Sequence, residues 1–143
     1  MYIFDGAMGT MLQAAGLEEG YCPELFNIER PEVVKDIHVQ YLQHGSDVIT
    51  TNTFGACGLK LEDYDLQDRV REINIAAVKV AKEAIAENKP TARVAGSMGP
   101  TGRFLQPLGN MSFDSIYDTY REQAEALIEG GVDFIIIETI IDV

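Results

Sequence analysis

The chain has 143 residues, of which 46% are hydrophobic, and its 23 acidic and 11 basic side chains give a net charge of −12. This length suffices for one domain with a core, the negative charge argues against nucleic acid as a partner, and no apolar run approaches the roughly 20 residues of a membrane-spanning helix. The two cysteines, Cys22 and Cys57, form no disulfide framework, and the N-terminus has no basic signal-peptide region. We therefore expect a cytoplasmic protein.

The chain begins with a short apolar run, residues 2–4, which predicts a first strand. Asp5 and the Gly6-x-x-Gly9 turn follow it. This spacing differs from the Gly-x-Gly-x-x-Gly pattern of dinucleotide sites, so a nucleotide-binding function is disfavoured. Residues 16–29, which contain glycine, proline and asparagine, predict a loop.

Three strand-helix units then follow one another without a linker. Apolar residues at helical spacing predict helices over residues 31–45, 65–88 and 112–131, with Pro31 in a first turn and glycines at two of the ends. Ser112 is the expected N-cap of the last helix. Strands are predicted over residues 46–55, 92–97 and 132–137. The last of these is an apolar run typical of a strand buried on both faces, and it leads directly into Glu138.

Alternating strands and helices indicate a parallel sheet. Every predicted strand ends in polar residues, which favours a (β/α)8 barrel, because such barrels gather functional residues at the carboxyl ends of many strands. A barrel needs about 250 residues, so we expect residues 1–143 to form its N-terminal half, about four βα units, with the remainder outside this chain. A complete small α/β domain is the alternative.

The polar groups at the strand ends are the candidate site. Two carboxylates, Asp5 and Glu138, are suited either to proton transfer as an acid–base pair or to binding an ammonium group, and the residues alone leave both uses open. The glycines of the first turn allow backbone N–H groups to approach an anion. Together these features make an amino acid a natural ligand. Three further residues at the strand ends join the candidate site, namely Thr51, Asn52 and Ser97.

Two other reactive side chains are weaker candidates. Cys57 follows the second strand, but no neighbouring base supports a role as a nucleophile. Arg103 lies in a loop and is interpreted as a surface charge.

Four motifs in the chain, taken in order, resemble the homocysteine S-methyltransferase family, and especially its cobalamin-dependent members. They are Asp5-Gly6-Ala7-Met8-Gly9-Thr10-Met11-Leu12-Gln13, Thr51-Asn52-Thr53-Phe54-Gly55-Ala56, Gly96-Ser97-Met98-Gly99-Pro100-Thr101-Gly102, and Glu138-Thr139 with Asp142. The resemblance spans the whole chain and implies the same barrel fold.

The resemblance also implies a function. Family members transfer a methyl group to the thiolate of homocysteine, bound to zinc, and so form methionine. Asp5 and Glu138 would hold the homocysteine amino group, and the backbone of Gly6, Ala7 and Met8, with Thr51, would help to place the substrate. In cobalamin-dependent members the donor is methylcobalamin, carried on another module, and a third module binds methyltetrahydrofolate. Other members use S-methylmethionine or betaine.

One departure from the family is important. The family's zinc ligands are three cysteines that follow later strands of the barrel, and neither Cys22 nor Cys57 occupies those motifs. We therefore expect this chain alone to bind no zinc and to be inactive, with zinc and cobalamin belonging to a longer parent protein. Two competing hypotheses are a non-catalytic amino-acid-binding domain and a different barrel enzyme that uses the two carboxylates for proton transfer.

Overall fold

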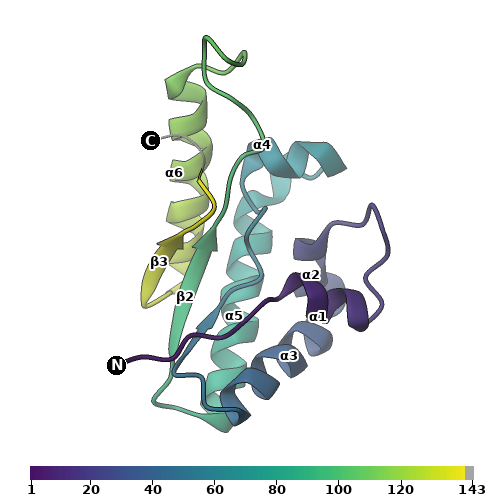
Figure 1. Ribbon diagram of the computed structural model, residues 1–143, viewed down its shortest axis with the longest axis vertical. Coiled ribbons are helices and arrows are strands. Elements are labelled where there is room, and N and C mark those ends of the chain that lie inside the picture. The colour runs from purple at the N-terminus through teal and green to yellow at the C-terminus, as the bar shows by residue number, and fades with distance from the viewer. Residues whose placement is uncertain (141–143) are drawn as a thin grey trace.

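A computed structural model describes residues 1–140, which form a parallel sheet packed against helices (Figure 1). The strand order is β1-β2-β3, and β1 and β2 are each followed by helices and then by the neighbouring strand of the sheet. The strands are β1 (Val48–Thr50), β2 (Arg93–Met98) and β3 (Phe134–Ile137). In the register, Ile49 lies opposite Val94, and Ser97 lies opposite Ile136. The predicted parallel α/β architecture is confirmed.

The N-terminal segment lies beside β1 but is not a full strand, so the predicted strand over residues 2–4 is wrong in extent. Phe4 forms a single parallel bridge with Val48. The backbone N–H of Asp5 donates to the Val48 carbonyl at 3.0 Å, and that of Asp47 donates to the Ile3 carbonyl at 2.7 Å. This segment pairs on one side only, yet the pairing brings Asp5 level with the carboxyl end of β1.

Three long helices lie side by side along one face of the sheet, with α5 between the other two (Figure 1). They are α3 (Pro31–Gln43), α5 (Val70–Asn88) and α6 (Phe113–Gly130). The apolar stripe predicted for the middle helix is buried, with Ile73, Ala77 and Ala81 fully inaccessible to solvent. It packs against the helices on either side and against the sheet.

The long helices begin and end at residues whose types are typical of helix caps. The Ser112 hydroxyl accepts a hydrogen bond from the Ser115 backbone N–H at 3.1 Å, which confirms it as the N-cap of α6. That helix ends at Gly131, whose φ of 88° is easily reached only without a Cβ atom. Gly45, with a φ of 107°, follows the end of α3 in the same way.

Short helices occupy segments in which the sequence analysis expected loops or continuous helix. The predicted loop over residues 16–29 contains one 3₁₀ turn and a single α-helical turn. The predicted helix over residues 65–88 becomes regular only at Val70, because Asp65 adopts a left-handed φ of 58°. The short elements are α1 (Gly9–Ala14), η1 (Pro23–Leu25), α2 (Phe26–Glu29), α4 (Gly58–Leu61), η2 (Glu62–Tyr64) and η3 (Gln67–Arg69).

The last strand is less buried than its apolar sequence predicted. Phe134 is 38% exposed and Ile137 is 71% exposed, whereas Ile135 packs against the cluster around Leu127 under α6. The prediction of burial on both faces is therefore wrong for residues 1–140. The reason is that β3 is an edge strand there, hydrogen-bonded to β2 alone and covered by α6 on one face.

Within the same residues, no helix combines the length and the apolar character needed to cross a bilayer. The described residues form three strands, so the eight-stranded barrel stays a prediction.

Candidate functional site

A cavity of about 530 Å³ lies at the carboxyl ends of the strands, beside the N-terminal segment. Its volume falls within the roughly 300–1,000 Å³ typical of small-molecule sites. All eight residues that the sequence analysis proposed as substrate-binding line this cavity, although they come from four separate segments. The fold thus brings these residues together at one cavity.

Asp5 is half-buried and held by the end of β1. One carboxylate oxygen accepts the Thr50 backbone N–H at 2.7 Å, and the other accepts the Thr50 hydroxyl at 2.8 Å. Burial raises the pKa of the Asp5 carboxyl above 3.8, and the negative charge of Glu138 raises it further, while the hydrogen bonds from Thr50 oppose the shift. The carboxylate is therefore fixed in place, and a nearby positive charge would stabilise its ionised form.

Glu138 follows β3 on the other side of the cavity. It is half-buried and accepts a hydrogen bond from the Ser97 hydroxyl at 2.5 Å. The next residue, Thr139, has a φ of 59°, which is rare for a β-branched residue and turns the chain sharply after the carboxylate. Among residues 1–140, no Lys, Arg or His lies within ion-pair distance of either Asp5 or Glu138.

The side chains of Thr51 and Ser97 join one strand end to the next, whereas that of Asn52 joins the segment after β1 to η1 and α2. The Thr51 hydroxyl accepts the backbone N–H of Ser97 at 3.1 Å. The Asn52 side-chain amide donates to the Pro23 carbonyl at 2.8 Å, and the Asn52 backbone carbonyl accepts from the Asn27 side-chain amide at 2.7 Å. All three candidates are buried, so they brace the wall of the cavity.

The backbone of Gly6, Ala7 and Met8 lines the cavity near Asp5. Within residues 1–140, the three N–H groups of this turn donate no hydrogen bond. Gly6 is closely packed, because an added Cβ atom would lie 3.0 Å from the Tyr41 hydroxyl oxygen and would require that side chain to shift. Free amide N–H groups beside two carboxylates offer complementary partners for an amino acid.

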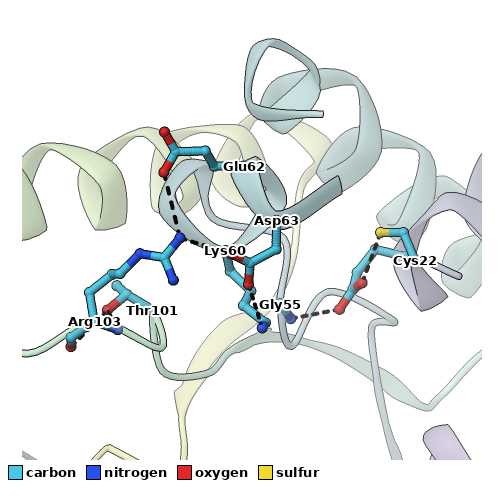
Figure 2. A network of polar contacts seen from close by, with 8 residues as sticks. Cys22, Gly55, Lys60, Glu62, Asp63, Thr101 and Arg103 are labelled. Carbon is cyan, nitrogen blue, oxygen red and sulfur yellow. Dashed lines mark hydrogen bonds and ion pairs between the residues drawn. The ribbon is translucent and has the colours of Figure 1, made fainter. Parts of the chain in front are cut away.

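Glu24 is a third carboxylate on the wall of the cavity, and the sequence analysis missed it. Glu24 is 5% exposed. Its carboxylate accepts hydrogen bonds from the Gly55 backbone N–H at 2.7 Å and from the Cys22 thiol at 3.3 Å (Figure 2, in which Gly55 and Cys22 are labelled). A single Glu in a segment without periodicity gave no signal of burial. Its effect is to tie the Pro23–Leu25 turn to the segment after β1.

The residues present do not fit a zinc site. No group of three His, Cys, Asp or Glu side chains in residues 1–140 has the geometry to hold a metal ion. Cys22 and Cys57 are both buried and free. Burial, assisted by the charge of Glu24, raises the pKa of the Cys22 thiol to about 12, and burial also raises that of Cys57. Neither thiol is poised to become the thiolate that zinc requires.

Arg103 forms ion pairs outside the cavity. Its guanidinium contacts the Asp63 carboxylate at 2.8 Å and the Glu62 carboxylate at 3.6 Å, and Lys60 reaches the same Asp63 at 2.8 Å (Figure 2). This agrees with its interpretation as a surface charge. Asp142, the last residue of the fourth motif, lies outside the described residues.

Comparison with known proteins identifies related sequences along the whole chain. The family model described as homocysteine S-methyltransferase matches residues 2–143. A methionine synthase from Mycobacterium tuberculosis is 41% identical over 145 residues, and one from Mycobacterium leprae is 39% identical. Each match covers 94% of this chain but only 12% of the relative, so the chain spans a small part of the length of these proteins.

Solved structures show the same fold. The metallated form of the homocysteine methyltransferase MmuM from Escherichia coli superposes with a TM-score of 0.80 at 27% identity, covering 97% of this chain and 54% of that one. Its oxidised form gives a TM-score of 0.77 at 25% identity, covering 94% and 51%. The chain therefore corresponds to about half of a homocysteine methyltransferase structure.

Proposed function

The chain belongs to the homocysteine S-methyltransferase family, and from this premise we propose that it is the N-terminal half of a (β/α)8 barrel that binds homocysteine. The single observation that carries the proposal is the pair of carboxylates, Asp5 and Glu138, which face one cavity with no cation among residues 1–140 to neutralise them. A carboxylate that is partly withdrawn from water, beside a second carboxylate, is stabilised by a nearby cation. An amino-acid ammonium group is such a cation.

The remaining groups of the cavity suit the other end of an amino acid. The free backbone N–H groups of Gly6 to Met8 are donors, and a carboxylate is the acceptor they match. Thr51 and Ser97 connect the strand ends behind these contacts, and Asn52 ties the segment after β1 to Pro23. In this arrangement the protein fixes the backbone of homocysteine at two points and leaves its thiol free to extend away from the carboxylates.

We assign the parent protein the activity of a methionine synthase, in which a methyl group passes to the sulfur of homocysteine. The support is the 41% identity to a protein of that name. Zinc and methylcobalamin, with a folate module, are proposed for parts of a longer protein, and no step of the reaction is assigned to them here because residues 1–140 form no metal site. The cytoplasmic location is likewise a prediction.

Kinetics of the protein expressed from its full-length gene test this function. Asp5→Asn and Glu138→Gln remove the charge that would hold the ammonium group, so we expect the KM for homocysteine to rise about 10- to 100-fold, the range for a lost hydrogen bond to a charged group. Glu18→Gln, a change at a residue outside this cavity, is the control and leaves the KM unchanged.

The outcomes separate the competing functions. An unchanged KM with a large fall in kcat in both variants would instead favour proton transfer by the two carboxylates. Binding of several amino acids irrespective of a thiol or of zinc, without methyl transfer, would favour a non-catalytic binding domain. Methionine formation from S-methylmethionine or betaine, in place of methylcobalamin, would change the methyl donor but not the site.

A further inference from the structure

The turn that lines the cavity after Asp5 is held by a side chain from a distant helix. The Tyr41 hydroxyl, on α3, donates a hydrogen bond to the Ala7 carbonyl at 2.9 Å. The hydroxyl oxygen and two ring carbons of the same tyrosine lie 3.0–3.3 Å from the position that a Cβ atom on Gly6 would occupy.

The contact fixes the direction of one peptide group. In a trans peptide the carbonyl of one residue and the N–H of the next point in opposite directions. Because the Ala7 carbonyl is directed to Tyr41, the Met8 N–H is directed away from α3. This N–H donates no hydrogen bond within residues 1–140, and Met8 lines the cavity. The hydrogen bond thus holds a free donor in one orientation.

We propose that Tyr41 is a positioning residue. It orients the Ala7–Met8 peptide so that the Met8 N–H can donate a hydrogen bond to the carboxylate of the substrate. The inference rests on the function proposed above and adds a specific residue to it. Tyr41 acts on the carboxylate end of the ligand alone, since the ammonium end is held by the side chains of Asp5, which Thr50 fixes, and of Glu138. The role therefore predicts an effect that depends on whether the ligand carries a carboxylate.

Calorimetric titration of the protein expressed from its full-length gene tests the proposal with two ligands. Homocysteine carries the carboxylate, and 3-amino-1-propanethiol lacks it but keeps the ammonium group and the thiol. Tyr41→Phe removes only the hydroxyl. We expect it to weaken homocysteine binding roughly three- to tenfold, as for one net hydrogen bond, and to leave the binding of 3-amino-1-propanethiol within about twofold.

Tyr120→Phe is the matched control. The Tyr120 hydroxyl donates a similar hydrogen bond, of 3.1 Å, to a loop carbonyl, that of Gly99, which does not line the cavity. This variant loses an equivalent bond and should bind both ligands as the unmodified protein does. Thermal unfolding of all three proteins shows that each is folded.

Two results would overturn the inference. One is homocysteine binding by Tyr41→Phe equal to that of the unmodified protein. The other is equal weakening of both ligands, because a general loss of structure would not depend on the carboxylate. A folded, unmodified protein that binds no homocysteine would overturn the proposed function itself, and the role of Tyr41 with it, which distinguishes the two failures.

Discussion

The charge of Asp5 links the site to pH. Burial and the neighbouring Glu138 raise the pKa of its carboxyl above 3.8, so Asp5 takes up a proton at a higher pH than an exposed aspartate does. A protonated carboxyl no longer attracts an ammonium group. Asp5 therefore makes its full contribution to binding at neutral pH and loses it as the pH falls through the raised pKa.

We predict that the dissociation constant for homocysteine rises as the pH is lowered from 7 toward 4, and that it rises less steeply in Asp5→Asn, which binds weakly throughout. Titration calorimetry across this range measures both curves. Parallel curves would show that Asp5 does not hold the ligand.

His38 provides a second titration, which acts on stability instead of binding. It lies fully buried in α3, and within residues 1–140 neither ring nitrogen has a hydrogen-bond partner. Burial lowers the pKa of His38 from 6.5 to about 4. The unfolded chain then binds a proton that the folded chain does not, so the folded state loses stability as the pH falls from about 6.5 to 4.

We predict that the free energy of unfolding contains a His38 contribution that falls by about 2 kcal/mol between pH 7.5 and 5. Urea unfolding of His38→Leu at the two pH values should show a correspondingly smaller loss. His44→Gln, at the exposed histidine of the same region, serves as the control and keeps the full loss. An identical pH dependence in all three proteins would contradict this assignment.

The residue types at the strand ends were readable from the sequence, but their contacts were not. Asp5 and Glu138 stood out because each follows an apolar run. Glu24 did not, because its burial depends on Gly55, which lies 31 residues further along the chain. Tyr41 gave no such signal either, since its hydroxyl reaches Ala7 across 34 residues.

At the scale of elements, two strands begin in the same way. The sequences around Gly45-Ser46-Asp47 and Gly131-Val132-Asp133 are alike, and both glycines have positive φ values. Asp47 accepts the Ile3 backbone N–H at 3.1 Å, and Asp133 accepts the Val94 backbone N–H at 2.8 Å. Each aspartate thus anchors its strand to the preceding one, as expected for a repeated βα unit.

Removing one such anchor should destabilise the sheet. We predict that Asp133→Ala lowers the free energy of unfolding by about 1 kcal/mol, through loss of the hydrogen bond to Val94. Asp118→Ala, on the exposed face of α6, is the control and should change it by less than about 0.5 kcal/mol. Chemical denaturation measures both changes, and equal effects would argue against a special role for the repeated aspartate.

Elements with strong local signals were predicted well, and elements defined by tertiary contacts were not. The helices α3 and α6 have apolar spacing, a proline or serine at the start and a glycine at the end, and the structure confirms them. The single turns of η1 and α2 are too short to show periodicity. The burial of β3 was misjudged because an apolar sequence cannot reveal which faces of a strand are covered.

At the scale of the whole molecule, the sheet has two open edges in residues 1–140. The outer side of β3 pairs with no strand there, and neither does the outer side of the N-terminal segment. Exposed apolar side chains lie at both places, including Phe4, which contacts Phe134 edge-to-face at 6.0 Å. Unpaired edges of this kind promote pairing with another chain.

We predict that residues 1–143, expressed alone, associate into dimers or larger species. Size-exclusion chromatography with light scattering gives the mass. Ile137→Lys places a charge on the edge strand at a position that is 71% exposed, and it should shift the population toward monomer. A compact monomer in the unmodified chain would contradict the prediction, and with it the view that these residues are half of a barrel.

The central claim is that Asp5 and Glu138 together hold the ammonium group of homocysteine. Its most direct test is a double-mutant cycle that removes the ammonium group from the ligand and the two charges from the protein. The ligands are homocysteine and 4-mercaptobutyrate, and the proteins are the one expressed from the full-length gene and its Asp5→Asn/Glu138→Gln variant. We predict that the variant loses at least tenfold in affinity for homocysteine and none for 4-mercaptobutyrate, whereas an equal loss for both ligands would contradict the claim.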